Sequence, residues 1–167
     1  MHPEAFEGFG WMLEDAEVDR HQPGLRVLDL GGQNVNGTVH DWFTDAVITT
    51  LDLENADIIA DATDWYPSED QEWDVVIATE VFEHVRDWPA ILDTAWAALI
   101  PGGAFITTCA STHRPAHGAT GAPAPVLGEW YLNVPPLLLE QELAKRFQIY
   151  GVEYRYPPGD AYAWARC

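Results

Sequence analysis

Short apolar runs rich in β-forming residues alternate along this chain with longer stretches of helical pattern. Residues 25–30 form the first such run and residues 73–78 the fourth, and turn residues separate each run from the helical stretch that follows. Alternation of this kind predicts an α/β fold, with a mostly parallel sheet covered by helices on both faces. We expect the 167 residues to form a single domain, because that length can bury one core.

We expect a Rossmann-like seven-stranded sheet, in which five parallel strands are followed by an antiparallel C-terminal hairpin. The strands are predicted at residues 25–30, 47–51, 57–60, 73–78, 104–109, 147–154 and 161–166. Helices are predicted at residues 3–18, 37–44 and 136–146, and from Pro89 to the turn Pro101-Gly102-Gly103. The connection between the second and third strands is too short for a full helix.

The chain is strongly acidic, with 27 acidic and 8 basic residues and a formal charge of −19. This charge opposes non-specific binding to nucleic acids and to anionic membrane surfaces. The N-terminus lacks the pattern of a signal peptide, and no apolar run approaches the roughly 20 residues of a membrane span. Two cysteines, Cys109 and Cys167, are too few for a disulfide scaffold. We therefore expect a soluble, cytoplasmic protein.

The most informative segment is the first strand together with the turn after it. An apolar run reaches Asp29 and then Gly31-Gly32, at the point where a strand gives way to a helix. Glycine allows close approach of the backbone to a ligand, and ligands of open α/β sheets bind beyond the carboxyl ends of the strands. The segment has neither the GxGxxG of dinucleotide-binding folds nor the Gly-Lys-Ser/Thr of a P-loop. It predicts a binding site of another kind.

Acidic residues also close the next two strands. Asp52 follows the second strand, where a carboxylate can accept hydrogen bonds from both hydroxyls of a ribose, and Asp61-Ala62 follows the third, where it can accept from an adenine amino group. Thr79 follows the fourth strand. Parallel strands end at one edge of a sheet, so we expect these residues to share one site.

The order Asp29-Gly31-Gly32, Asp52, Asp61-Ala62, WDVVIATEVFEHV and LIPGGAFITT resembles the class I S-adenosylmethionine (SAM)-dependent methyltransferases, specifically the type 11 group. The resemblance implies SAM as cofactor and a seven-stranded sheet whose last strand is inserted antiparallel. It also implies how the residues would contact SAM. Asp29, Gly31, Gly32 and Thr79 would hold the methionine end, Asp52 the ribose, Asp61 and Ala62 the adenine, and Leu53 and Trp65 would form walls around the adenine ring.

The glycine turn departs from the pattern of this family. The usual GxGxG would place glycines at Gln33 and Val35, whereas the sequence here is GGQNVNG, with Gly37 displaced toward the helix start. The departure affects the contacts expected of this loop more than it affects the expectation of SAM binding.

Glu80, Glu83 and His84 are the first candidates for the chemistry of methyl transfer. If a helical turn begins here, their i, i+3, i+4 spacing places them on one face, where they can contact the acceptor or act as a base. Two carboxylates and an imidazole can also hold Mg²⁺ or Mn²⁺. The element is similar to the metal-binding ExxEH of small-RNA 2′-O-methyltransferases and ubiquinone-pathway O-methyltransferases. We do not expect a metal, and metal assistance remains the lesser alternative.

Residues 110–128 form a long connection rich in proline and glycine, which is typical of a lid or binding loop. Its histidines, His113 and His117, are candidates for contacting the acceptor, and Arg114 is a candidate for pairing with an acidic acceptor group. Trp130 and Tyr131, just before the last helix, either line the acceptor pocket or pack in the core.

The leading hypothesis is a SAM-dependent methyltransferase that acts on an oxygen or nitrogen of a small molecule. A small acceptor is favoured because the chain has little room for a recognition domain and its charge opposes nucleic acid. A SAM-binding regulator or inactive partner is the main alternative, which turnover to S-adenosylhomocysteine would distinguish. A Rossmann protein for NAD or a nucleotide sugar is a third, disfavoured by the absent GxGxxG. Oligomeric state and acceptor identity are not predicted.

Overall fold

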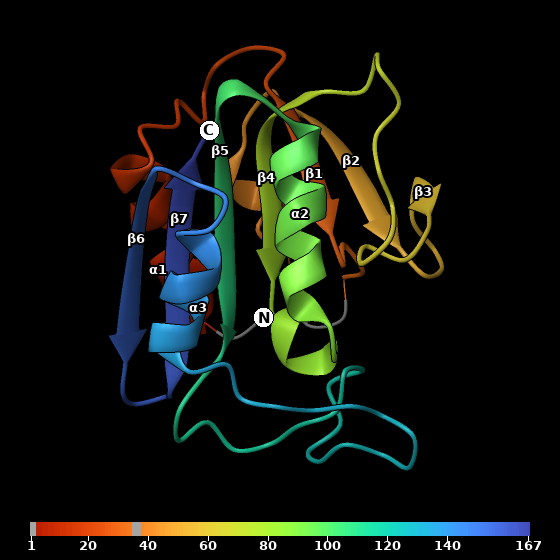
Figure 1. Cartoon of the computed structure of the whole chain (residues 1–167), viewed down its shortest axis with the longest axis vertical. Helices are drawn as coiled ribbons and strands as arrows, with labels where there is room; N and C mark the ends of the chain where they lie inside the picture. The colour runs from red at the N-terminus through yellow and green to blue at the C-terminus, as the bar shows by residue number, and fades with distance from the viewer. Residues whose placement is uncertain (1–2, 35–37) are drawn as a thin grey trace.

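The computed structural model describes residues 3–34 and 38–167 and contains one seven-stranded sheet in the order β3-β2-β1-β4-β5-β7-β6. The strands are β1 (Arg26–Leu30), β2 (Val47–Asp52), β3 (Ile58–Ile59), β4 (Trp73–Thr79), β5 (Leu99–Ala110), β6 (Ile149–Arg155) and β7 (Asp160–Arg166). Only β7 runs antiparallel to its neighbours, β5 and β6, while the remaining pairs are parallel. The predicted fold class is confirmed (Figure 1).

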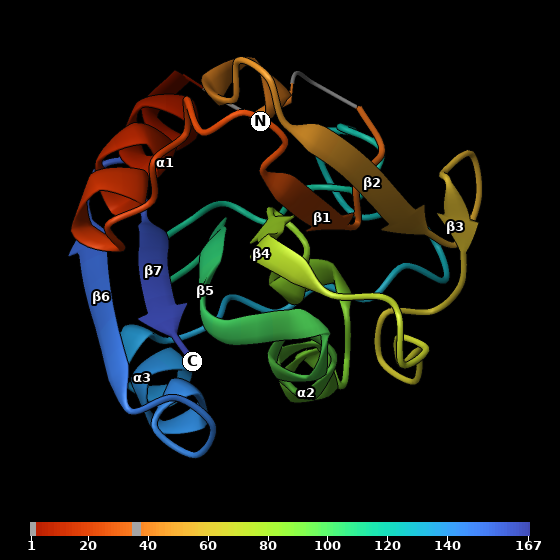
Figure 2. The same cartoon turned by 90° about the horizontal axis from the view of Figure 1, so that it is seen from above.

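Helices cover both faces of the sheet, as Figure 2 shows. The α-helices are α1 (Pro3–Asp15), α2 (Trp88–Ala98) and α3 (Pro136–Leu143), and the short 3-10 helices are η1 (His40–Trp42) and η2 (Phe82–His84). α1 lies against one face, while α2 and α3 lie against the other.

Alternation of side chains along the central strands separates two apolar cores. On β1, Val27 packs with Phe9 and Met12 of α1, whereas Leu28 faces the core that contains Ile91 of α2 and Leu139 of α3. Successive side chains of a strand point to opposite faces, so a strand buried on both sides has to be apolar throughout. This explains why the strand runs are almost continuously apolar in the sequence.

Several boundaries differ from the predicted ones. α1 ends at Asp15 rather than residue 18, because the chain turns at Glu17, whose φ is 55°. β5 begins at Leu99 rather than residue 104, since Leu99 already pairs with Trp73 before a register shift. The helix predicted at residues 37–44 is reduced to η1, and residue 37 lies outside the described residues.

The connection between β5 and α3 crosses the edge at which the parallel strands end (Figure 1). It is held to that edge by hydrogen bonds at both of its ends. Ser111 Oγ donates to the carbonyl of Val134 over 2.6 Å, and the Val134 N–H donates to the carbonyl of Ala110 over 2.9 Å.

Of the helices in residues 3–34 and 38–167, none is long and apolar enough to cross a membrane.

Candidate functional site

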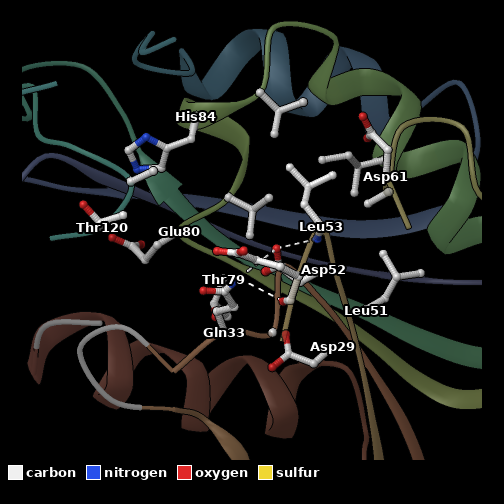
Figure 3. Close-up of a pocket in the computed structure, with 18 of the residues that line it drawn as sticks. Asp29, Gln33, Leu51, Asp52, Leu53, Asp61, Thr79, Glu80, His84 and Thr120 are labelled. Carbon is white, nitrogen blue, oxygen red and sulfur yellow. Dashed lines mark hydrogen bonds between the residues drawn. The ribbon is translucent and has the colours of Figure 1, made fainter. Parts of the chain in front are cut away.

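A pocket of about 870 Å³ lies at the carboxyl edge of the strands. Its lining includes all eight residues predicted to hold the cofactor: Asp29, Gly31, Gly32, Asp52, Leu53, Asp61, Ala62 and Thr79. In Figure 3, Leu53 and Asp61 lie on one side of the pocket and Glu80 and His84 on the other, with Asp52 between them. The fold therefore brings these predicted residues together, and their individual contacts with a cofactor stay predictions.

Gly31 is the residue of the turn that has to be glycine. Its φ is 78°, a conformation that side chains rarely adopt, and a Cβ atom there would lie 2.4 Å from Val81 Cγ2. Val81 itself lines the pocket. The close approach of β1 and the segment after β4 thus depends on the missing side chain.

Gln33 connects the glycine turn with the end of β2. Its Nε2 donates to Asp52 Oδ1 over 3.4 Å and to the carbonyl of Glu54 over 3.0 Å, and the Leu53 N–H donates to the same Asp52 oxygen over 2.6 Å (Figure 3). In the sequence, Gln33 stands where the family pattern has a glycine, and that pattern does not predict this bridge. Val35 and Gly37 of the same loop lie outside the described residues.

Asp29 is a buried carboxylate with a histidine partner. Only 4% of the residue is exposed, and His40 Nε2 lies 2.7 Å from its Oδ2. Burial raises the pKa of Asp29, while the hydrogen bond and the charge of His40 oppose that rise. His40 was not predicted as a site residue, since nothing in the sequence relates it to Asp29.

The adenine end of the predicted site agrees with the structure only in part. Asp61 Oδ1 accepts hydrogen bonds from the backbone N–H and the hydroxyl of Thr63, over 2.9 and 2.7 Å, so its carboxylate also stabilises a turn. Leu53 is an exposed wall of the pocket. The prediction that Trp65 forms a wall around the adenine ring is wrong. Trp65 does not line the pocket, and its ring centroid lies 6.0 Å from that of Trp73.

Glu80, Glu83 and His84 do not share a helical face, which corrects the sequence-based expectation. Glu80 has a φ of 59°, and the 3-10 helix begins only at Phe82. Glu80 lines the pocket and accepts a hydrogen bond from Thr108 Oγ1 over 2.9 Å. Glu83 points instead into the protein, where it is fully buried and its Oε1 accepts from the Ala110 N–H over 3.0 Å. Glu83 is therefore not placed to contact an acceptor directly.

Glu83 and His84 are joined by His117 from the β5–α3 connection. One donor atom from each of these three residues lies within 4.8 Å of the others. Glu80, which the sequence analysis included, is not in this group. Glu83 Oε2 and His84 Nδ1 are buried and have no hydrogen-bond partner within the described residues. Burial, followed by the charge of Glu80, raises the pKa of Glu83 well above its ordinary value.

His84, His117 and Tyr131 form an aromatic cluster at one end of the pocket. The ring centroids are 5.1 Å apart for the two histidines, and Tyr131 lies 5.5 Å from His84 and 5.0 Å from His117. Burial, followed by the charge of His117, lowers the pKa of His84 to about 4. His84 is therefore a neutral imidazole at neutral pH. Burial raises the pKa of Tyr131, which keeps its hydroxyl protonated.

Two predictions for the β5–α3 connection do not agree with the structure. His113 does not line the pocket; its Nδ1 lies 3.0 Å from the hydroxyl of Tyr154 on β6, and its ring packs near Tyr156. Arg114 lines the pocket, but its Nη1 pairs with the fully buried Asp160 at 2.9 Å, so this guanidinium already has an acidic partner. His117 is the loop histidine that reaches the pocket.

Arg86 is a pocket residue that the sequence analysis missed. It follows η2, lines the pocket, and its guanidinium lies 4.6 Å from the centroid of the Trp130 ring. The sequence contains 8 basic residues against 27 acidic ones, and this rarity was the only sign that Arg86 could have a role. Its position beside Trp130 could not be predicted, because no spacing rule relates the two residues. Trp130 and Tyr131 thus lie beside the pocket residues rather than in the main core.

Comparison with protein families finds a match over residues 13–155 to a family described as methyltransferase domain. Among curated proteins, none matches this chain.

Solved structures with the same fold include several methyltransferases. DhpI, in complex with S-adenosylhomocysteine, is 23% identical, with 84% of this chain and 76% of that one covered and a TM-score of 0.63. The plantazolicin methyltransferase BpumL is 12% identical, with 97% and 81% covered and a TM-score of 0.67. The Burkholderia thailandensis 1,6-didemethyltoxoflavin-N1-methyltransferase is 15% identical, with 97% and 77% covered and a TM-score of 0.67. At these identities the likeness shows the fold.

Proposed function

We propose that this chain methylates an oxygen or nitrogen of a small molecule. The premise is that it belongs to the methyltransferase-domain family and is a class I SAM-dependent methyltransferase. The finer assignment to the type 11 group stays a prediction. One observation carries the proposal: a single pocket is lined both by the eight predicted cofactor residues and by Glu80, His84 and His117.

The cofactor side of the pocket suits a ligand that carries positive charge and an adenosine. Three carboxylates, Asp29, Asp52 and Asp61, line it, and each lies near the carboxyl end of a different strand. SAM supplies a methyl group activated by a sulfonium, together with the ammonium of its amino-acid end. Asp29 is buried and Asp52 half-buried, whereas Asp61 is exposed. Carboxylates that are partly removed from water attract cations more strongly than exposed ones do, so Asp29 and Asp52 contribute most of this attraction. Gly31, also on this side, lets the end of β1 approach Val81, where a Cβ would lie 2.4 Å from Val81 Cγ2.

The acceptor side supplies alignment more than strong base catalysis. A neutral His84, with a pKa of about 4, is a poor general base at neutral pH, but it can hydrogen-bond an acceptor and orient it. His117 lines the same end of the pocket, and the rings of His117 and Tyr131 both pack against His84. Methyl transfer is an in-line displacement, so holding the acceptor atom in line with the methyl–sulfur bond is the main requirement.

The size and charge of the site support a small acceptor. Pockets of about 300–1,000 Å³ are typical for small molecules, and this pocket of about 870 Å³ has to hold the cofactor as well. The formal charge of −19 opposes polyanionic acceptors such as nucleic acids. The Burkholderia thailandensis enzyme of the same fold was crystallised with the small molecule 1,6-didemethyltoxoflavin.

Titration calorimetry with S-adenosylhomocysteine, the demethylated product, tests the cofactor assignment. We expect the Asp52→Ala variant to bind at least tenfold more weakly, because it loses charge-assisted hydrogen bonds worth about 1.5–3 kcal/mol. Asp45→Ala is the matched control, since Asp45 precedes β2 at the opposite edge of the sheet and is exposed. It removes the same charge and should leave affinity unchanged.

Two results would contradict the proposal. If the unaltered protein has no measurable affinity for SAM or for S-adenosylhomocysteine, the cofactor assignment is wrong. If it binds SAM but forms no S-adenosylhomocysteine with a panel of small hydroxyl and amine acceptors, the acceptor class is wrong. An equal loss of affinity in Asp52→Ala and Asp45→Ala would refute the ribose contact alone.

A second candidate, metal-assisted transfer, is favoured by the cluster of Glu83, His84 and His117. Two imidazoles and one carboxylate are ligands suited to Zn²⁺, Mn²⁺ or Fe²⁺. The unpartnered Glu83 Oε2 and His84 Nδ1 fit such a role, because buried polar atoms normally have partners. A metal at these residues would draw an acceptor oxygen toward the pocket and lower its pKa.

Metal binding is measurable without an activity assay. Calorimetry with ZnCl₂ or MnCl₂ should show one site per chain that is lost in His117→Ala and retained in His113→Ala. Full turnover in the presence of a chelator, together with no metal affinity of the purified chain, would eliminate this candidate and leave the metal-free mechanism.

A further inference from the structure

Asp29 is held by a residue that lies outside the pocket lining. Asp29 lines the pocket from the end of β1, whereas His40 does not line the pocket and reaches Asp29 from η1, with Nε2 and Oδ2 2.7 Å apart. The side chain of His40 is 26% exposed and that of Asp29 only 6%. The pair therefore places a partly solvated imidazole behind a carboxylate that is nearly removed from water.

A buried carboxylate without a partner tends to take up a proton. Burial raises the pKa of Asp29, and the charge of Asp52 adds to this effect, whereas the hydrogen bond and charge of His40 act in the opposite direction. His40 also engages one of the two carboxylate oxygens, which limits rotation of the side chain. An ionised and fixed Asp29 is what a cationic ligand group requires.

The backbone around His40 is anchored to the core. The His40 N–H donates to Thr38 Oγ1 over 3.1 Å, and the neighbouring Val39 is buried. Trp42 Nε1 donates to the carbonyl of Phe6 on α1 over 3.1 Å, and its ring lies 5.2 Å from that of Phe6. The contacts of Trp42 with α1 thus hold η1 in place, and with it the imidazole of His40 that orients Asp29.

We propose that His40 is a positioning residue for the amino-acid end of SAM. It holds the Asp29 carboxylate in the orientation and charge state that bind the ligand ammonium, and it has no direct contact with the ligand. This inference rests on the proposed function, in which Asp29 meets the methionine end of SAM.

The proposal predicts an effect on one part of the ligand only. S-adenosylhomocysteine carries the ammonium, whereas 5′-methylthioadenosine lacks the amino-acid group and keeps the adenosine. We expect His40→Ala to weaken S-adenosylhomocysteine binding about tenfold and to change 5′-methylthioadenosine binding less than twofold. His40→Gln retains an N–H donor and should recover most of the affinity.

Two further variants separate positioning from a general structural role. Asp29→Asn should show the same ligand selectivity as His40→Ala, and the double variant should lose little more than either single one, since both remove one interaction. His21→Ala is the control, because His21 is exposed and its Nδ1 bonds only the nearby Thr44 hydroxyl, at 2.8 Å, among the contacts described for its side chain.

The outcomes distinguish this inference from the function on which it rests. Equal loss of both ligands in His40→Ala, or unchanged affinity for both, overturns the role of His40 while the cofactor assignment stands. Absence of S-adenosylhomocysteine binding by the unaltered chain overturns the proposed function and this inference together. If His40→Ala does not fold, His40→Phe replaces it, because phenylalanine keeps a ring and has no donor: a loss of affinity for S-adenosylhomocysteine alone supports the proposal, and equal losses for the two ligands refute it.

Discussion

The two ends of the pocket are built in different ways. At the cofactor end, the lining residues follow the strands β1, β2, β3 and β4, so that the sheet itself brings them to one edge. At the acceptor end, the lining comes from the segment after β4 and from the long connection between β5 and α3 (Figure 1). The position of a strand end follows from a short sequence pattern, whereas the course of a long connection depends on contacts between distant residues.

The acceptor end is nevertheless held firmly by such contacts. The Leu132 N–H donates to the carbonyl of Glu83 over 2.8 Å, and Asn133 Nδ2 donates to the carbonyl of Arg114 over 2.9 Å. Arg114 in turn pairs with the buried Asp160. These contacts join residues that are far apart in the sequence: Asn133 and Arg114 are 19 positions apart, and Arg114 and Asp160 are 46 apart. The difference between the two ends is therefore one of predictability, and mutations can test it.

The largest effect is expected at the cofactor end, for Gly31→Ala. Gly31 and Gly24 have similar φ angles, 78° and 75°, but a Cβ at Gly31 would meet Val81 at 2.4 Å, whereas one at Gly24 would meet nothing within 4 Å. Both variants pay about 1–2 kcal/mol for the left-handed conformation, and Gly31→Ala adds about 1–3 kcal/mol of overpacking. Urea unfolding and calorimetry with S-adenosylhomocysteine measure both effects.

Gly24→Ala provides the comparison because it shares the strain without the contact. It should lose some unfolding free energy and keep the affinity for S-adenosylhomocysteine, while Gly31→Ala loses both. Similar losses of stability in the two variants, with affinity retained in both, would show that the turn does not need glycine at position 31.

The second prediction compares two histidines of the acceptor end that the sequence treats alike. His117→Ala should lower kcat/KM about tenfold, or by about 1.4 kcal/mol, because the imidazole lines the pocket and packs against His84 and Tyr131. His113→Ala should change it less than twofold, because His113 contacts Tyr154 outside the pocket. Steady-state kinetics with a working acceptor measures both, and a greater effect of His113→Ala would contradict the structure.

The same pair shows where sequence-based prediction stops. Asp29, Asp52 and Thr79 were located from strand ends alone, because a parallel sheet fixes which ends coincide. The two loop histidines are four residues apart and chemically identical, so sequence offers no means of choosing between them. The choice depends on contacts within the folded chain, where His113 lies beside Tyr154 of β6 and His117 packs against His84.

The third prediction concerns how the free energy of unfolding depends on pH through His84, at the acceptor end. The His84 imidazole has a pKa of about 4 in the folded chain and an ordinary value of 6.5. Between these values the unfolded chain binds a proton that the folded chain does not, so the free energy of unfolding falls as pH falls from about 6.5 to 4. The slope from this group is at most about 1.4 kcal/mol per pH unit. Above pH 6.5 the contribution is constant.

His84→Phe isolates this contribution, since it keeps a ring and removes the titrating group. Urea unfolding at several pH values should show a shallower loss of stability for His84→Phe than for the unaltered chain over that interval. His21→Phe, at an exposed histidine, should follow the unaltered chain. Parallel curves for all three proteins would mean that His84 is not desolvated as the structure indicates.

The expectation for Glu80, Glu83 and His84 failed for a physical reason that spacing does not reveal. A common face requires helical torsions from Glu80 onward, but the left-handed φ of 59° at Glu80 delays the turn until Phe82. Phe82 is fully buried, and its ring stacks on Trp88 at 5.0 Å. Packing of this apolar side chain thus fixes the direction of its polar neighbours.

The smallest effect is expected for Gln33→Ala, which tests a cofactor-end contact that strand ends did not predict. Gln33 Nε2 bonds Asp52 at 3.4 Å and the Glu54 carbonyl at 3.0 Å, and the first of these is long for a hydrogen bond. Loss of both should weaken S-adenosylhomocysteine binding about threefold, near 0.7 kcal/mol, which is within the range for neutral or partly exposed hydrogen bonds. Calorimetry beside Asp52→Ala gives the ratio between the two variants. If Gln33→Ala loses as much affinity for S-adenosylhomocysteine as Asp52→Ala does, the loop rather than the strand end determines ribose binding. Both ends of the pocket would then depend equally on connections that the sequence does not predict.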